Sequence, residues 1–460
     1  MITKYLLAFV LAFPVQGEGV EHSVSGTTVA SSEEIEFSTY FTDSTLRVDY
    51  VFCGDAAHQA VYLQSLAKGG VWAGRRHRLQ EPPMKGNGQI RVKEPESGKI
   101  LYANCFSSLF QEWQSYEEAL TVPRAFENSF QLPFPRRKVE VELLLFDTRG
   151  RVYASVSHPV DPDDILIRQQ GASAGETEVL EENAPVEKAI DIVFLSEGYT
   201  AAEKEKFSKD ARRAVQALTA HEPFARRREA FNFRSVFVPS ADSGPSFPRR
   251  GDWRNTVAGS HYDTFYSDRY LTSSSMQKIY DALGDTPFEH IILLVNTPTY
   301  GGGGILNSLT IMSTDHPTFK EVLVHEFGHA FGGLADEYDY GDLEEPMYPD
   351  GTEPWEPNIT TLTDFAAKWQ DLLPEGTPVP TPEDRIGTDG DVRRGWKTLS
   401  EADKRLLNGK IGVYEGAGYR KRGVYRPTQV CRMRINECEE FCPVCTRALE
   451  YVIDCYTDNF

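Results

Sequence analysis

Hydrophobic and polar residues alternate differently in the two halves of the chain. From about residue 30 to residue 160, short stretches alternate in polarity or run apolar over the length of a strand, with Gly, Pro and Asn between them. One helix is expected near residues 112–119. We therefore predict an antiparallel, sandwich-like all-β domain. The clearest strands are expected at residues 36–41, 46–52, 88–92 and 139–146.

From residue 188 the pattern changes to strands that alternate with helices. Thr200 and Glu203 have capping-box spacing at the start of an amphipathic helix. A glycine turn is expected at residues 301–304, followed by a strand and then a helix that ends near Gly332-Gly333. This order places the last helix beside a sheet edge, where an extended peptide could add as a strand. The other strands are expected at residues 189–196, 232–238, 290–296 and 308–312, and a further helix at 274–283.

Polarity also marks the predicted domain boundaries. Residues 1–17 have the pattern of a signal peptide, with Lys4 before a short apolar run and small residues at a plausible cleavage site. We expect a sandwich-like accessory domain at 18–160, a polar linker at 161–187 and a second, α+β domain at 188–460. The apolar run is too short to cross a bilayer, so the prediction is export to the periplasm or the extracellular space.

Composition and charge exclude some classes of binding partner. The 460 residues have the apolar, charged and aromatic fractions of a globular protein, and the formal net charge is −20. Nucleic acids and anionic lipids require basic surfaces, so neither is an expected partner. No stretch after residue 17 is long and apolar enough to span a membrane.

The strongest chemical signal is the pattern H-E-x-x-H at His325, Glu326 and His329. Positions four apart lie on one face of a helix, so both imidazoles can reach one zinc ion at about 2 Å. Glu326 lies beside the first histidine, where its carboxylate can accept a proton from a water activated by the metal. We predict that both histidines bind zinc and that Glu326 is the general base.

A catalytic zinc needs a third protein ligand. In some zinc peptidases a third histidine follows H-E-x-x-H at a fixed spacing and binds the metal. In this chain that position is occupied by Ala335, which cannot bind metal. Along a continuous helix, Asp336 would lie about 16 Å from His325. We therefore expect a turn at Gly332-Gly333, with Asp336 as the third ligand and Glu337 as the alternative.

Several motifs resemble those of the bacterial IgA peptidase-like zinc metallopeptidases, and residues 46–52 and 72–74 resemble the accessory domain of that family. The resemblance implies a zincin-like catalytic domain, zinc endopeptidase activity, a protein or peptide substrate and an exported location. It does not imply that immunoglobulin is the substrate, because the family is broader than its name. The motifs are residues 325–329 with 333–338, 192–200, 416–419, 423–427, 431–434 and 441–445.

The C-terminal part offers further candidates. Met433 is a candidate for the methionine turn that forms an apolar floor under the metal of many zincins, although a methionine that fills a core gap would look the same. Tyr419, Tyr425 and Arg426 could donate to an oxyanion, but tyrosine in such a stretch is more often structural.

Cysteines concentrate in the last thirty residues, which hold five of the seven. In an exported protein we expect them to form disulfides that pin the region near the active site. The alternative is a structural zinc bound by Cys438, Cys442, Cys445 and Cys455.

The sequence thus predicts a secreted zinc metalloendopeptidase. The alternative is a binding protein of the cell envelope, in which the sandwich domain adheres to glycan or protein and the zincin domain is vestigial. The intact Glu326 favours the enzyme, since an inactive site need not keep its base.

Overall fold

The computed structural model describes residues 34–340, 348–349, 351–384 and 395–457. Residues Ile35–Phe460 form one compact unit. The predicted signal peptide at 1–17 lies outside the described residues. Among the helices of the described part, none has the length and apolar character needed to cross a membrane.

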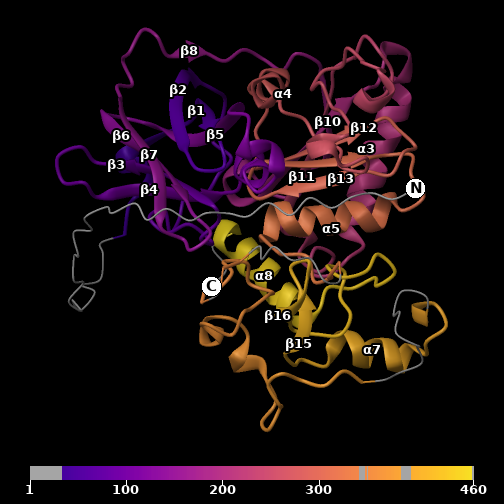
Figure 1. The fold of residues 1–460 in the computed structure, drawn as a ribbon. Coiled ribbons are helices and arrows are strands. Elements are labelled where there is room, and N and C mark those ends of the chain that lie inside the picture. The colour runs from indigo at the N-terminus through magenta and orange to yellow at the C-terminus, as the bar shows by residue number, and fades with distance from the viewer. Residues whose placement is uncertain (1–33, 341–347, 350, 385–394, 458–460) are drawn as a thin grey trace. The chain divides into compact units, whose positions relative to one another are not determined.

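Two four-stranded sheets make up the N-terminal β-rich region (Figure 1). One sheet has the order β5-β1-β2-β8 and the other β4-β3-β6-β7. All neighbours are antiparallel except β2 and β8. Both sheets contribute to one hydrophobic cluster, which explains the alternating polarity of their strands. The bounds are β1 Phe41–Gly54, β2 Gln59–Lys68, β3 Gly88–Lys93, β4 Ile100–Phe106, β5 Arg124–Pro135, β6 Val139–Phe146, β7 Val152–Val160 and β8 Arg168–Gln169.

The prediction of a strand at 36–41 is wrong, because α1 spans Phe37–Tyr40 and β1 begins only at Phe41. Phe37 and Phe41 are four residues apart, so one helical turn brings both rings to the same side, with centroids 5.6 Å apart. Both rings belong to the cluster between the sheets. The helix expected near 112–119 is two short helices, α2 (Leu109–Trp113) and η1 (Glu117–Leu120).

A six-stranded sheet forms the centre of the second region, with the order β13-β14-β12-β10-β11-β9. The four inner strands are parallel, and the edge strands β13 and β9 are antiparallel to their neighbours. The bounds are β9 Glu176–Glu181, β10 Ile190–Glu197, β11 Phe231–Phe237, β12 His290–Val295, β13 Gly302–Ile305 and β14 Leu309–Ser313.

Helices cover both faces of this sheet, with α4 above it and α5 below it in Figure 1. Successive residues of β10 alternate between the two layers: Ile192 and Phe194 pack in the cluster with α3, α5 and α8, whereas Val193 and Leu195 pack with α4. Every residue of β10 is buried, as predicted for this stretch. The bounds are α3 Lys204–Thr219, α4 Met276–Leu283, α5 Phe319–Gly332 and α8 Pro443–Thr457.

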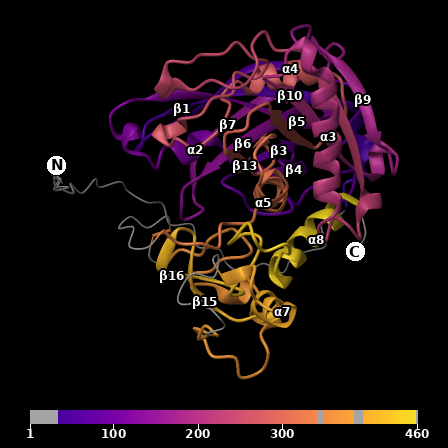
Figure 2. The ribbon, with the colours of Figure 1, turned by 90° about the vertical axis from the view of Figure 1, so that its right-hand side faces the viewer.

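The remaining α-helix and β-strands of the described residues lie in the C-terminal part, drawn in orange and yellow in Figure 2. They are α7 (Glu401–Gly409) and a hairpin of β15 (Tyr414–Ala417) and β16 (Arg420–Arg426). The short 3-10 helices are η2 Val186–Lys188, η3 Ala201–Glu203, η4 Arg228–Ala230, η5 Pro248–Arg250, η6 Thr264–Tyr266, η7 Phe365–Ala367 and η8 Gln370–Leu372.

The segment 161–187, expected to be a linker, contains β8 and β9. Strand β9 pairs with β11 at the edge of the six-stranded sheet, and its side chains are partly or fully exposed. A polar sequence therefore fits this edge strand as well as it fits a linker. The domain boundaries stay a prediction.

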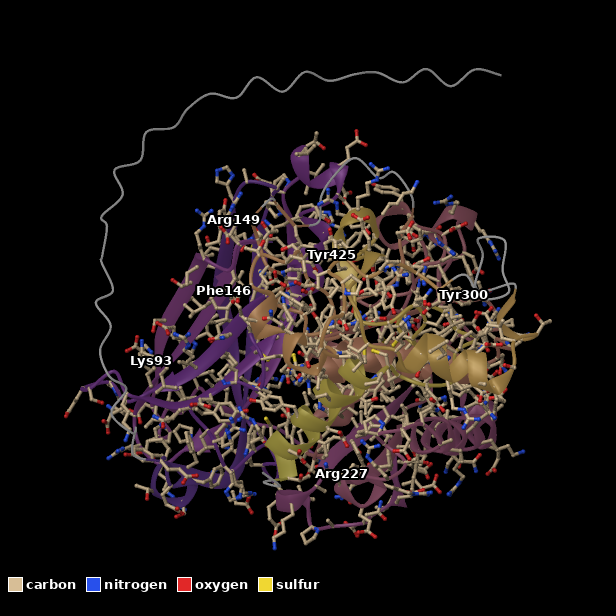
Figure 3. The ribbon with its side chains drawn as sticks, turned by 90° about the horizontal axis from the view of Figure 1, so that it is seen from below. Lys93, Phe146, Arg149, Arg227, Tyr300 and Tyr425 are labelled. Carbon is tan, nitrogen blue, oxygen red and sulfur yellow. The ribbon has the colours of Figure 1, made fainter. Side chains whose placement is uncertain are left out.

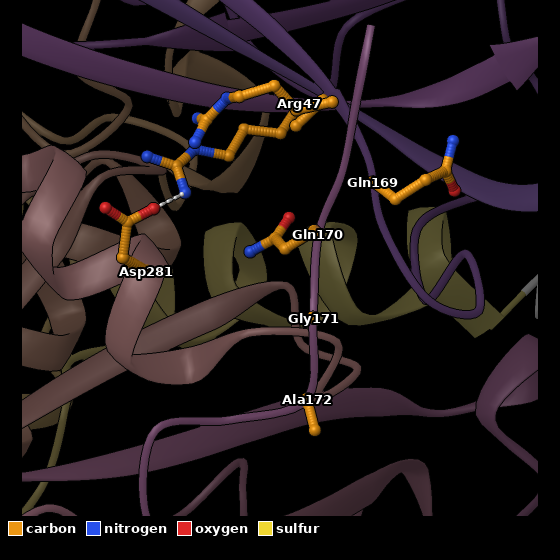
Figure 4. A pocket seen from close by; sticks show the side chains of 8 residues that line it. Arg47, Gln169, Gln170, Gly171, Ala172 and Asp281 are labelled. Carbon is orange, nitrogen blue, oxygen red and sulfur yellow. Dashed lines mark hydrogen bonds and ion pairs between the residues drawn. The ribbon is translucent and has the colours of Figure 1, made fainter.

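Arg47 of β1 connects the β-rich region to α4. Its guanidinium is almost fully buried, and it donates to Asp49 at 2.8 Å and to Asp281 of α4 at 2.5 Å (Figure 4). Arg47 and Asp281 line a cavity of about 110 Å³, together with residues 168–172. None of the predicted site residues lines this cavity.

Candidate active site

The predicted metal helix is α5, which Figure 2 shows nearly end-on below the sheet. Val322, Leu323 and Phe327 pack into the core with α3 and α8. This packing fixes the rotation of the helix about its axis. His325 is buried and His329 is partly buried.

A left-handed residue ends α5 and turns the chain back. Gly333 has φ +58, and its N–H donates to the His329 carbonyl at 3.0 Å, the αL form of helix termination. A Cβ at this position would clash with the Met84 sulfur and lie 2.8 Å from Trp355. Glycine is required here both by conformation and by space.

This turn brings Asp336 to the two histidines. Its Oδ1 lies 3.0 Å from His325 Nε2 and 3.4 Å from His329 Nε2, and the two Nε2 atoms are 3.1 Å apart. Ligands with bonds of about 2 Å to one ion lie about 3.3 Å from each other, so the three atoms fit one metal. Glu337, the alternative ligand, points away into a group of cysteines.

Backbone carbonyls orient both imidazoles. His325 Nδ1 lies 3.1 Å from the Arg432 carbonyl, and His329 Nδ1 lies 2.5 Å from the Leu334 carbonyl. A carbonyl only accepts, so each Nδ1 carries the hydrogen and each Nε2 keeps its lone pair for a metal. The Arg432 carbonyl belongs to the segment of Met433, whose sulfur lies against Gly328 of α5.

The electrostatics of the site favour a cation. Asp336 is buried, its Oδ2 accepts a hydrogen bond from Tyr419, and its Oδ1 has no hydrogen-bond partner in the described part of the chain. Burial raises the pKa of Asp336, but His329 and His325 outweigh it and hold that pKa well below its usual range. Burial lowers the pKa of His329, yet Asp336 raises it to about 9, so the metal-free imidazole takes up a proton that a metal ion would displace.

Glu326 lies against the edge strand β13. A Cβ on Gly302 would be 3.2 Å from Glu326 Cγ, and one on Gly304 would clash with the Glu326 carbonyl. The glycine run was predicted as a turn; it is a strand whose missing side chains allow close approach to α5. The outer edge of this strand is already paired at Gly302 by a bridge to Tyr270, which limits the space for an added peptide strand.

Sequence reasoning missed three residues near the site. Tyr270 donates to Glu112 of α2 at 2.6 Å. Burial raises the pKa of Glu112 to about 7, while the hydrogen bond from Tyr270 and the charge of His329 lower it and the charge of Glu326 raises it further. The β-rich region therefore places a titratable group within electrostatic reach of His329 and Glu326. Tyr300 is partly exposed. Its pKa is raised mainly by partial burial and, as the second cause, by the negative charge of Glu326. None of the three has a local sequence motif.

The predicted oxyanion donors are not brought together. Arg426 is fully buried and donates to the carbonyls of Glu415 and Gly416, and the Tyr419 hydroxyl donates to Asp336. Tyr425 lies on β16, where its backbone pairs with Thr360; it is well separated from Tyr300 in Figure 3. Arg426 therefore holds the β15–β16 hairpin.

The cysteines are arranged differently from both expectations. All seven lie in the described residues and all are free, so the expected disulfides are not formed. Cys431, Cys442 and Cys445 gather with Glu337. The Cys438 thiol donates a hydrogen bond to the Glu440 carbonyl, and Cys455 lies near Arg78. The predicted zinc ligands Cys438, Cys442, Cys445 and Cys455 therefore do not converge on one point.

Comparison with known families identifies the family of this chain. The sequence profile described as IgA Peptidase M64 matches residues 179–395 and 393–453, and the profile described as Peptidase M64 N-terminus matches residues 36–157. The chain belongs to the IgA Peptidase M64 family. The resemblance noted in the sequence is thereby confirmed. A search of curated proteins found no match.

Membership in the M64 family makes this chain a peptidase of a metallopeptidase family, with a protein or peptide as substrate. The matched regions include both the H-E-x-x-H helix and the cysteine-rich C-terminal segment. The group of His325, His329 and Asp336 is a candidate metal site within this peptidase.

Proposed function

We propose that this M64 peptidase is a secreted, zinc-dependent endopeptidase with a zincin-like catalytic domain. The observation that carries the proposal is the convergence of His325 Nε2, His329 Nε2 and Asp336 Oδ1 beside Glu326. Two imidazoles and a carboxylate are a known ligand set for catalytic zinc, which leaves one position for water or substrate.

Zinc held by these three residues would act as a Lewis acid toward the attacking water and the scissile carbonyl. Glu326 accepts the proton of this water and passes it to the leaving amine. Burial raises the pKa of Glu326, and this makes its carboxylate a stronger base. Tyr300 is partly exposed and its pKa is raised by burial and by the charge of Glu326, so its hydroxyl is a candidate donor to the oxyanion.

Substitution of the base separates catalysis from metal binding. Glu326→Gln is expected to lower kcat for a casein substrate by about 10²–10⁴-fold, the usual contribution of a general base, with zinc content unchanged. The control Glu205→Gln alters an exposed carboxylate on α3 and is expected to keep full activity. Full activity of Glu326→Gln would contradict the assigned role.

A zinc-free wild-type protein that cleaves neither casein nor gelatin would instead favour the binding-protein alternative. Chelator-sensitive cleavage supports the enzyme, provided that added zinc restores it.

Export and the domain boundaries form part of the same proposal. We infer that residues 1–17 are removed as a signal peptide, that 18–160 form an accessory domain and that 188–460 form the catalytic domain. N-terminal sequencing of the mature protein is expected to begin near residue 18. A mature protein that starts at Met1 would contradict export by this route.

A further inference from the structure

A second group of side chains with metal-binding atoms lies next to the group of His325, His329 and Asp336 in the chain fold, since Glu337 directly follows Asp336. Glu337, Cys431, Cys442 and Cys445 are all fully buried, and their ligand atoms lie within 4.8 Å of one another. The group draws on three segments: the turn after α5, the segment of Met433, and the start of α8. None of the four belongs to the ligand set proposed for catalysis.

Backbone N–H groups hold the sulfur atoms in place. Cys442 precedes the first residue of α8, and its Sγ accepts from the N–H of Cys445 at 3.5 Å. The Cys431 Sγ accepts from the N–H of Cys442 at 3.2 Å. N–H groups at the start of a helix favour the thiolate, which is the form that binds metals.

Glu337 provides an observation independent of the cysteines. Its Oε1 accepts from Asn358 at 2.9 Å and from the Cys445 thiol at 3.1 Å. Its Oε2 is buried and has no hydrogen-bond partner within the described residues. A buried carboxylate with an unpartnered oxygen is unfavourable unless a proton neutralises it or a cation compensates its charge.

We propose that Glu337, Cys431, Cys442 and Cys445 bind a second, structural zinc ion. Zinc takes thiolate and carboxylate ligands in a closed tetrahedral site. With Zn–S bonds of about 2.3 Å, two ligand sulfurs of a tetrahedral site lie about 3.8 Å apart. The Sγ atoms of Cys431 and Cys445 are 3.8 Å apart. Zinc binding releases the thiol protons to solvent.

A disulfide is the competing state of these cysteines. It would join two sulfurs at about 2.05 Å and leave the third thiol beside Glu337, with Oε2 still unpartnered. A single zinc ion engages all four side chains. The geometry therefore favours the metal over oxidation.

The second zinc would support the first site from two sides. Glu337 follows Asp336 directly, and its N–H donates to the Met433 carbonyl at 2.9 Å. Cys431 precedes Arg432, whose carbonyl orients His325. Loss of the second ion is therefore expected to weaken zinc binding at the catalytic site as well.

Zinc content of the full-length protein and of single variants tests the proposal. The wild type is expected to hold about two zinc ions per chain by elemental analysis, and His329→Ala about one. X-ray absorption of His329→Ala is expected to show sulfur at about 2.3 Å from the remaining zinc. Cys445→Ser is expected to lose the sulfur-bound ion, and Cys438→Ser, outside the group, to keep both.

Two results would overturn the proposal. One is a zinc spectrum of His329→Ala without sulfur ligands, which does not depend on whether the cysteine variants fold. The other is a wild-type mass that shows a disulfide among Cys431, Cys442 and Cys445. Failure of the catalytic proposal would appear separately, as zinc content that His329→Ala does not change.

Discussion

Neighbouring carboxylates have different surroundings in this chain. After Gly333 the backbone has no regular structure, and Asp336 and Glu337 point to different partners. Asp336 faces the two histidines of α5, and Glu337 faces three cysteines. Spacing from H-E-x-x-H selected both residues as candidates, but only the direction of each side chain separates them. We propose Asp336 rather than Glu337 as the third ligand of the catalytic metal for this reason.

Tyr419 is the residue that holds Asp336 in place, since its hydroxyl donates to Oδ2 while Oδ1 faces the histidines. Tyr419→Phe is expected to lower zinc affinity at this site by about 10–100-fold, as is usual for loss of a partner of a metal ligand. Zinc titration against a competing chelator measures the change.

Tyr425→Phe is the matched control for this substitution, because Tyr425 lies near Tyr419 in sequence, on β16, and pairs there with Thr360 through its backbone. It is expected to bind zinc as the wild type does. Equal affinities of the two variants would contradict a positioning role for Tyr419.

Helix α5 depends on the turn that ends it. Gly333→Ala places a methyl group in a left-handed conformation and against Met84 and Trp355. Strain of about 1–3 kcal/mol and overpacking of about 1–3 kcal/mol are expected to add, and Asp336 should shift with them. Denaturant unfolding and zinc content measure the two effects.

Gly376→Ala separates strain from packing. Gly376 also has positive φ, at +79, but a Cβ there meets nothing within 4 Å. Its substitution should therefore show only the strain and keep the zinc. A Gly333→Ala protein as stable as Gly376→Ala, with full zinc content, would contradict the requirement for this turn.

The spacing of apolar residues predicted those elements whose structure depends on their local sequence. Strands β10 and β12 and helix α5 follow from apolar runs and helical spacing. The glycine run at 301–304 carries no such pattern, because its structure depends on the close approach of Glu326 and His329. Phe37 and Phe41 fit either a strand or a helical turn, and only their shared cluster decides.

At the scale of the whole molecule, β1 and α4 are joined by a buried charge. Arg47→Met removes the buried guanidinium partner of Asp49 and leaves it with the exposed Arg168 at 3.8 Å, and it is expected to destabilise the protein by about 3–5 kcal/mol. Asp281→Asn removes the exposed partner and should cost less than about 1 kcal/mol. Denaturant unfolding compares them, and equal losses would contradict the importance of burial.

Contacts between distant segments account for what the sequence did not predict. The cysteine group forms because Cys431 lies beside the start of α8, which spacing alone does not reveal. Glu112 reaches the catalytic region from a domain in which no chemistry was expected. Family motifs identified the reaction class, whereas the arrangement of these residues required the fold.

The most direct test is a zinc-edge anomalous difference map of crystals of the Glu326→Gln protein. The account predicts a peak bounded by His325 Nε2, His329 Nε2 and Asp336 Oδ1, with Glu337 outside its coordination sphere. A map without a peak at the histidines, or a peak there that contacts Glu337 in place of Asp336, would contradict it.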